Sequence, residues 1–255
     1  MLPAGCLVLA LASGLAAHAD PQAAAIDLGR AHLRERHGRL QDALAQSPFG
    51  APVVVESVDG EDFMRADVYG ILDEPLAALS TTLQDPAHWC GLACLHPNVK
   101  AAALDRSGGA DLLTFYVGRK HFKKPEHSQS ITYAFRAAGD TNDYFSVLLS
   151  SDTGPHGTRD HRVRCEGLAL GPDRSFIRLL YSCRYGVVAR SGLALYLVTL
   201  GRNKVGFSVV GREKDGSPVY IKGTRGIVER NAMRYYLAVK AYMQGLAQPA
   251  GLRFE

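Results

Sequence analysis

The sequence predicts an α+β fold in which a curved antiparallel sheet grips a long C-terminal helix. From residue 99 onward the chain is a series of extended segments separated by turn clusters, and one long helical pattern follows them. On that last pattern, apolar residues recur at helical spacing and form one broad face: Val228, Ala232, Tyr235, Tyr236, Val239, Met243 and Leu246. A helix with such a face needs a concave surface to receive it, and a bent sheet supplies one. We expect an apolar cavity between the two.

Length and composition are those of an ordinary globular protein. The chain has 255 residues, of which 47% are hydrophobic and 21% are charged, and its formal net charge is +4. Lysine and arginine are scattered among acidic residues rather than clustered, so we expect no nucleic-acid partner. No repeat or linker divides the chain, and we predict one domain over residues 20–255.

The N-terminal stretch Met1–Ala19 is almost wholly apolar and is predicted to be a signal peptide. It ends with Ala17 and Ala19 in an Ala-x-Ala pattern before Asp20. The usual basic residues before the apolar stretch are missing, which leaves the true start codon open. A buried N-terminal helix is the alternative, but the stretch is too short to span a membrane and ends in small residues. We therefore expect a periplasmic or secreted protein.

The first predicted element of the mature chain is a helix over Ala23–Gln46. Its basic residues are Arg30, Arg34, Arg36 and Arg39. Two interpretations stay open. They form the solvated face of a helix that packs against the domain, or they make a transient contact with an anionic membrane surface.

The strands and the remaining helices follow from alternation and turn signals. A short helix is predicted over Pro75–Leu83, ended by Asp85 and Pro86, and the final helix begins near Gly226. Strands are predicted at Val53–Val58, Phe63–Leu72, Val99–Leu104, Leu112–Gly118, Ser130–Ala137, Tyr144–Ser150, Asp160–Leu170, Phe176–Tyr185, Val205–Val210 and Val219–Lys222. The segment Val187–Leu200 is nearly all apolar, which predicts a helix that is either buried or a lid over the cavity.

Two pairs of cysteines remain once the signal peptide is removed: Cys90 with Cys94, and Cys165 with Cys183. In an oxidising compartment they permit two disulfides. A three-residue loop, Asp173–Ser175, would place Cys165 directly opposite Cys183 on the same side of a strand pair. Buried free thiols are the alternative, and both interpretations stay open.

Two histidines and two cysteines occur within nine positions: His88, Cys90, Cys94 and His96. Thiolate and imidazole suit zinc or copper. However, three residues separate the cysteines instead of the usual two, and four ligands from one short segment would crowd a tetrahedral centre. We expect no metal and no cofactor here. A Cys90–Cys94 disulfide, plain thiols and a Cys-His nucleophile are the other interpretations.

Arginines gather at the start of the last helix, where the helix dipole opposes positive charge. Arg225, Arg230 and Arg234 lie there with Glu229. They either form ion pairs with Glu229 and nearby acids, or bind an anionic group at the mouth of the cavity. Further arginines on the strands could contribute to such a site: Arg119, Arg136 and Arg184.

The order of elements resembles the START-like helix-grip proteins, also called the SRPBCC superfamily. The matching stretches are Asp67–Leu72 leading into Glu74–Leu76, Leu83–Asp85 leading to Trp89, and Gly216–Pro218 before the last helix. The stretch Glu229–Tyr236 also resembles a group of secreted proteobacterial proteins, which implies no activity.

The resemblance implies a binding or carrier protein for a lipid or other hydrophobic small molecule, without catalysis. An enzyme on the same scaffold, a hydrolase or cyclase with His88 or His96 as a base, is the main alternative. A partner of an envelope complex that docks through the first helix is another. The expected ligand-binding residues are Trp89, Arg119, Tyr133, Tyr181, Tyr185, Arg225, Arg230, Tyr235 and Val239.

Overall fold

The computed structural model describes residues 21–121, 124–140, 142–186, 190–192, 197, 199, 201–249 and 251. The predicted signal peptide Met1–Ala19 lies outside these residues. Most of the predicted helix Val187–Leu200 also lies outside them, and within it residues 190–192 are helical. None of the described helices is long and apolar enough to cross a membrane.

The centre of the molecule is an antiparallel sheet of eight strands in the order β1-β2-β8-β7-β6-β5-β4-β3. Its strands are β1 (Val53–Asp59), β2 (Phe63–Leu72), β3 (Val99–Asp105), β4 (Leu112–Val117), β5 (Gln129–Asp140), β6 (Tyr144–Thr153), β7 (Thr158–Ala169) and β8 (Ser175–Tyr185). The strands from β3 to β8 form a continuous meander. The hairpin of β1 and β2 joins this meander through the pairing of β2 with β8.

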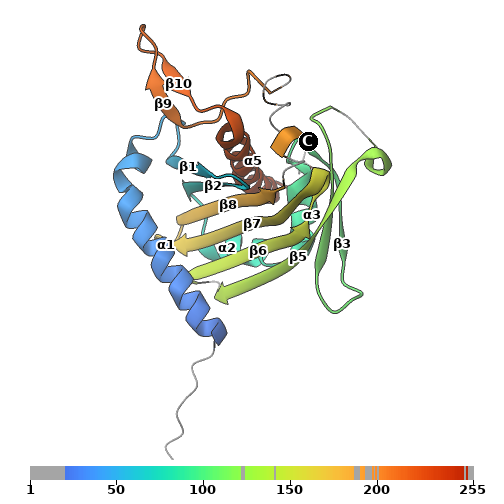
Figure 1. Ribbon diagram of the computed structural model, residues 1–255. Coiled ribbons are helices and arrows are strands. Elements are labelled where there is room, and N and C mark those ends of the chain that lie inside the picture. The colour runs from blue at the N-terminus through green and yellow to red at the C-terminus, as the bar shows by residue number, and fades with distance from the viewer. Residues whose placement is uncertain are drawn as a thin grey trace, which may run out of the picture.

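One face of the sheet holds the helices α2 (Leu76–Leu83), α3 (Pro86–Cys94) and α5 (Gly223–Leu246). Helix α5 lies on β1, β2 and β8, while α3 lies on β3 and β4, and the two helices contact each other. Strands lie about 4.8 Å apart, so in a flat sheet of eight strands the edge strands β1 and β3 would be too far apart for α5 and α3 to touch. The sheet is therefore curved around the helices (Figure 1). The predicted α+β class, with a curved antiparallel sheet gripping a C-terminal helix, is confirmed.

The predicted helix Pro75–Leu83 is confirmed as α2, but the sequence analysis missed helix α3, which follows it directly. Asp85 is the N-cap of α3, and its carboxylate accepts a hydrogen bond from the backbone N–H of Ala87 at 3.0 Å. Pro86 occupies the first helical turn, where a missing N–H costs nothing. The aspartate and proline that follow the first helix therefore also start the second.

Alternation along β2 separates the two faces of the sheet. Ala66 and Val68 belong to the core under α5, whereas Tyr69 belongs to a smaller cluster under α1 (Pro21–Ala45). Gly70 allows α5 to approach closely, because a β-carbon there would collide with the hydroxyl of Tyr236. This contact sets how near the helix lies to the strand.

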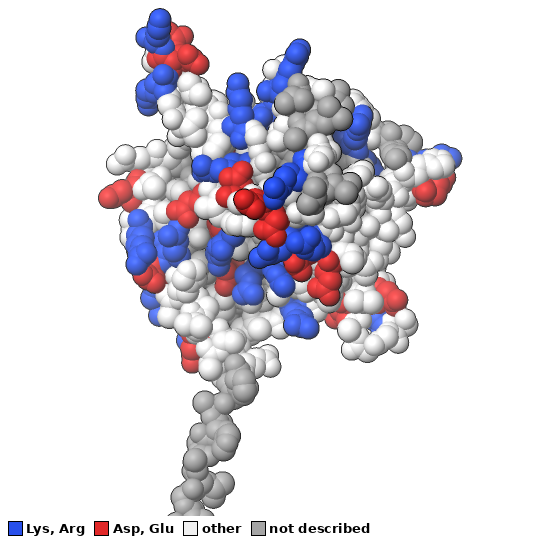
Figure 2. Space-filling model, in the orientation of Figure 1, with Lys and Arg blue, Asp and Glu red and all other residues white. Residues whose placement is uncertain are grey.

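The outer face, which α1 crosses, carries an ionic network. Arg178 is only 6% exposed, and its guanidinium lies 2.7 Å from Asp67 and 2.6 Å from Glu166. Tyr144 donates a further hydrogen bond to Glu166 at 2.6 Å. Figure 2 shows acidic and basic side chains mixed over this face. Each buried charge thus has opposite charges or hydrogen bonds around it, which buried ions require.

Helix α1 packs against the sheet through Leu33, Leu40 and Leu44, all of them buried. Its arginines pair with acids: Arg36 with Glu56, Arg39 with Glu35, and Arg30 and Arg34 with Asp143. This favours the interpretation of a helix that packs on the domain with a solvated face.

A short hairpin of β9 (Val209–Arg212) and β10 (Pro218–Tyr220) projects from the body of the molecule (Figure 1). The prediction of a strand from Val205 was wrong at its start. The carboxylate of Glu229 takes the backbone N–H groups of Phe207 and Ser208, at 2.6 and 2.9 Å, so these residues do not join a strand ladder. Glu229 is the anchor of this segment, and within the described ranges no salt bridge joins it to Arg225 or Arg230.

The predicted register of the two cysteine strands was also wrong. Ala169 pairs with Ser175, so residues 170–174 form the loop, and Cys165 faces Leu179 instead of Cys183. The cysteines do share one face, but they are separated by roughly 13 Å along the strands. A disulfide needs α-carbons within about 7 Å, so both are free thiols, as are Cys90 and Cys94.

Glu229 should dominate the stability of the N-terminal end of α5. Its side chain is fully buried and also accepts from the hydroxyls of Ser57 and Ser208, at 2.6 and 2.7 Å. Glu229→Ala leaves two backbone amides and two hydroxyls without a partner. We expect a loss of about 3 kcal/mol or more in the free energy of unfolding, measured by urea denaturation. Glu213→Ala, at an exposed hairpin position, should change it by less than about 0.5 kcal/mol. Equal effects of the two changes would contradict the anchoring role.

Candidate functional site

A row of hydrogen-bonding side chains crosses the concave face of the sheet beneath α5. Ser151 on β6 pairs with His161 on β7, Cys183 follows on β8, and Tyr133 lies beyond on β5. All four are buried, and they continue the alternation that points Leu149 inward. We call Cys183, His161, Ser151 and Tyr133 the polar row.

Four aromatic rings connect the polar row to the helices above it. Tyr181 of β8 stacks on Tyr235 of α5 with ring centroids 6.1 Å apart. His161 lies 6.4 Å from Tyr181, and His96, just after α3, lies 4.7 Å from Tyr235. The curvature of the sheet therefore brings together residues from β7, β8, α3 and α5 that are far apart in sequence.

Hydroxyl groups at this site lack partners. The hydroxyls of Tyr133 and Tyr235 form no hydrogen bond with any residue that the structure describes. Both oxygens nevertheless keep some accessible surface, since they are absent from the fully occluded polar atoms without a partner. Other buried tyrosines are satisfied: the hydroxyl of Tyr185, for example, donates to the carbonyl of Gly60 at 3.0 Å. These two hydroxyls therefore keep unused hydrogen-bonding capacity in a largely buried region.

Each of the two histidines has one unpartnered nitrogen, and the hydrogen bonds fix which one carries the proton. Nδ1 of His96 accepts from the backbone N–H of Asn98 at 3.2 Å, so the proton of the neutral ring is on Nε2, which has no partner. The hydroxyl of Thr158 donates to the carbonyl of Pro155, so its oxygen must accept from Nε2–H of His161 at 2.8 Å. Nδ1 of His161 is therefore an acceptor without a donor.

The site is uncharged at neutral pH. Burial lowers the pKa of His161 to about 4, and burial with the nearby charge of Arg234 lowers the pKa of His96 to about 4. Burial also raises the pKa of Tyr133 and Tyr181 well above its usual value and that of Cys183 to about 12. The site thus offers neutral hydrogen-bonding groups on apolar walls.

Of the ligand-binding residues predicted from sequence, the structure brings Tyr133, Tyr181 and Tyr235 together. Trp89 and Val239 are fully buried in the core, and the indole N–H of Trp89 donates to the carbonyl of Leu83 at 2.8 Å. The hydroxyls of Tyr133 and Tyr235 remain the groups with unused hydrogen-bonding capacity.

The predicted arginines are not brought to the tyrosines. Arg225 donates to the hydroxyl of Ser57 at 3.0 Å, Arg230 contacts the carbonyl of Val205 at 3.3 Å, and Arg119 is exposed after β4. The structure therefore gives no support for an arginine site at the cavity.

Sequence reasoning missed His161 and Ser151 as site residues. A histidine at an inward position of an otherwise apolar strand face was the available signal for His161. The earlier candidates do not converge, since His88 contacts the hydroxyl of Tyr242 at 2.9 Å and His96 contacts Tyr235. Within the described ranges, no group of three or more possible metal ligands occurs.

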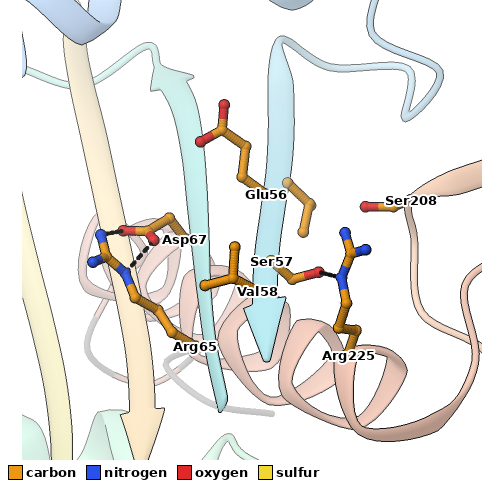
Figure 3. A pocket seen from close by; sticks show the side chains of 8 residues that line it. Glu56, Ser57, Val58, Arg65, Asp67, Ser208 and Arg225 are labelled. Carbon is orange, nitrogen blue, oxygen red and sulfur yellow. Dashed lines mark hydrogen bonds and ion pairs between the residues drawn. The ribbon is translucent and has the colours of Figure 1, made fainter. Parts of the chain in front are cut away.

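A pocket of about 530 Å³ lies at the edge of the sheet, around β1 and the start of α5 (Figure 3). Arg65 pairs with Asp67 at 2.7 Å and Glu56 pairs with Arg36, whereas Arg225 donates to the neutral hydroxyl of Ser57. Among the described residues, no carboxylate forms a salt bridge with Arg225.

Comparisons with known proteins bear on the fold only. No family model and no curated protein matches this sequence. Among solved structures, human StAR-related lipid transfer protein 5 has a TM-score of 0.44 and 8% identity, over 88% of this chain and 99% of its own. Human STARD10 has a TM-score of 0.43 and 12% identity, over 75% of this chain and 71% of its own. The Zhui aromatase/cyclase of a Streptomyces species has a TM-score of 0.42 and 12% identity, over 74% of this chain and 98% of its own. These TM-scores are low, so the likenesses carry no argument about a ligand or an activity.

The two histidines should make stability depend on pH. Their folded pKa of about 4 lies below the unfolded value of about 6.5, so the unfolded chain binds more protons between these values. Above pH 6.5 the two histidines therefore do not lower the free energy of unfolding. As the pH falls toward 4, each histidine removes up to about 1.4 kcal/mol per pH unit from the free energy of unfolding. His161→Gln should reduce this slope in urea denaturation between pH 4.5 and 6.5.

His127→Gln, at an exposed position, is the matched control and should leave the slope unchanged. An unchanged slope for both His161→Gln and His96→Gln would show that the rings are not held neutral in the folded protein.

Proposed function

We propose that this protein binds and carries a lipid or other hydrophobic small molecule without transforming it, in the space between α5 and the concave face of the sheet. The proposal includes the periplasmic or secreted location expected from Met1–Ala19. One observation carries it. Tyr181 stands deep in the molecule between His161 and Tyr235, and yet its side chain keeps accessible surface.

Surface that is accessible at such depth indicates open space rather than a filled interior. Phe135, in the same cross-strand row as Tyr181, is also partly exposed, whereas Leu149 and Val163 between them are fully buried. The unpartnered hydroxyls of Tyr133 and Tyr235 adjoin the same region. An interior packed for stability alone would close around these groups.

An apolar space of this kind is sufficient for useful affinity. Each buried methylene contributes about 0.8 kcal/mol, so about ten of them give roughly 8 kcal/mol before the costs of association. Binding of an alkyl chain or a ring system therefore needs no ionic contact.

An enzyme on the same scaffold is the second candidate, and one observation favours it over a purely passive carrier. Nδ1 of His161 is a neutral imidazole nitrogen with a free lone pair, as a general base requires, and it is occluded, so a substrate would reach it only after the surrounding side chains move. His96 is less suited to that role, because its free nitrogen carries the proton. An enzyme would release a changed molecule, whereas a carrier returns its ligand unaltered.

Native mass spectrometry after gentle purification tests the proposal. The folded protein should carry a hydrophobic molecule that organic denaturation releases, and the emptied protein should bind a fluorescent hydrophobic probe saturably. Phe135→Trp enlarges a partly exposed side chain in the same cross-strand row as Tyr181. It should weaken probe binding at least about tenfold, because it fills part of the space.

Val58→Phe, on a side chain that is 53% exposed, is the matched control and should leave binding unchanged. Thermal unfolding of both variants establishes that they are folded. A wild-type protein with no bound molecule and no uptake of the probe would disprove the carrier function.

A further inference from the structure

We propose that the free edge of β1 binds an extended peptide segment of a partner protein as an added strand, and that Arg225 binds an acidic side chain of that segment. The site is the pocket of about 530 Å³ between β1 and the start of α5. It is distinct from the interior site, and the inference does not rest on the proposed carrier function.

The first step is the unpaired backbone of the edge strand. The carbonyl of Pro52 and the N–H of Gly60 are hydrogen-bonded to β2 and its extension, and alternation along the ladder then directs the backbone groups of Val55 and Ser57 away from β2. No described residue forms a hydrogen bond with these outward groups. Because β1 is the last strand of the sheet, its outward N–H and C=O groups are a template for a further strand.

The second step is the regularity of this edge. All seven residues of β1 pair with β2 in an unbroken register, and none of them is proline. The opposite edge strand of the sheet, β3, has a register shift between Val99 and Ala101. Bulges and prolines are among the features that make an edge strand unsuitable for pairing. β1 has neither, so its backbone geometry suits the addition of a strand.

The third step is the room beside the edge. Four consecutive residues of β1, Val55–Val58, line the pocket, which corresponds to about 13 Å of strand. In Figure 3, β2 lies on one side of β1, and Ser208 and Arg225 lie on the other. Val58, an apolar side chain of this edge, is 53% exposed. A peptide of about four extended residues therefore matches the length of β1 that the pocket leaves open.

The fourth step is a cation without an acidic partner. Nε of Arg225 donates to the hydroxyl of Ser57 at 3.0 Å, and its two terminal nitrogens form no hydrogen bond with a described residue. Both acids that line the pocket, Glu56 and Asp67, are already paired with other arginines. Arg225 is half-buried, so a carboxylate that enters the pocket meets a partly desolvated guanidinium with free donors.

The carboxylate of Glu229 is near Arg225 but leaves this role open. It is fully buried and does not line the pocket. Its oxygens already accept four hydrogen bonds, two of them from the hydroxyls of Ser57 and Ser208, which do line the pocket. These donors compensate the charge of Glu229, and the two hydroxyls lie between it and an incoming carboxylate.

Alternation of side chains places the acidic residue within the added strand. Val55 packs against the core under α5, and Ser57 contacts Arg225 on the same face of β1. A peptide residue beside Ser57 projects to this face and can reach Arg225, whereas the residue two positions away lies beside Val55. The site thus fits an apolar residue and an acidic residue in alternation. Backbone hydrogen bonds supply affinity, and these two side chains supply specificity.

Three capped peptides test the proposal: Thr-Val-Thr-X-Thr-Val-Thr with glutamate, glutamine or lysine at X. The sequence reads the same from either end, so parallel and antiparallel pairing present the same pattern to β1. Fluorescence anisotropy at pH 7.5 measures binding to the folded protein. The glutamate peptide should bind at least about tenfold more tightly than the glutamine peptide, because the hydrogen bonds between carboxylate and guanidinium are charge-assisted. The lysine peptide should bind most weakly, since it brings a like charge to Arg225.

Arg225→Gln should bring the affinities of the glutamate and glutamine peptides within about twofold of each other. Arg162→Gln, at an exposed position of β7, is the matched control and should keep the difference between the peptides. Thermal unfolding establishes that both variants are folded. A preference for glutamate that survives in Arg225→Gln overturns the role of Arg225.

N-methylation of the glutamate peptide tests the added strand without changing the protein. In antiparallel pairing the N–H of the central glutamate points to β1, whereas in parallel pairing the N–H of the threonine that follows it does so. Methylation of one of these two nitrogens should weaken binding at least about tenfold, and methylation of the other should change it by less than about threefold. Equal binding of the two methylated peptides overturns the strand addition.

Two further results would also overturn the inference. One is the absence of saturable binding of all three peptides up to about 1 mM. The other is competition by glutarate that equals that of the glutamate peptide, which would make the pocket a site for small anions only. Neither result affects the carrier function, because that function is tested by uptake of a hydrophobic probe at the interior site.

Discussion

The position of α5 on the sheet determines which side chains meet in the interior site. At its N-terminal end, Glu229 fixes the helix to β1 and to the segment before β9 through four hydrogen bonds. About two turns further on, Tyr236 packs in the space left by Gly70. These contacts fix the height and rotation of the helix, and the same rotation turns Tyr235 toward Tyr181 and His96. The interior site is thus a consequence of how the helix is attached.

The two faces of the sheet accommodate polar groups in different ways. Under α1, Arg178 and its two carboxylates are buried together, so that each charge is compensated within the network. Under the middle of α5, the polar row and the neighbouring tyrosines are neutral, and several of these groups have no partner among the described residues. Compensated charges make a rigid surface that has no need of a ligand. Uncompensated neutral groups leave hydrogen-bonding capacity, which water or a ligand can use.

The sequence was sufficient for the order of the strands and for their inward faces, because both follow from local alternation and from the amphipathic last helix. It was insufficient for register. The loop between β7 and β8 is longer than predicted, and this moved Cys183 away from Cys165. Nor could it assemble the polar row, whose members come from four neighbouring strands and are aligned by the register of those strands. Arg225 and Arg230 were predicted as ligand-binding residues because of their charge. Their partners are a hydroxyl and a backbone carbonyl outside the interior site.

The interior polar groups are difficult to explain by folding stability. A buried hydrogen-bonding group without a partner costs about 1–3 kcal/mol, and a domain has only about 5–15 kcal/mol of net stability. Phenylalanine at Tyr133 or Tyr235 would keep the ring packing and remove this cost. His96 and His161 add further unpartnered nitrogens in the same region. Unpartnered groups that weaken the empty protein agree with the proposed binding function, because a bound ligand can supply hydrogen bonds that folding leaves unmade and thereby stabilise the protein.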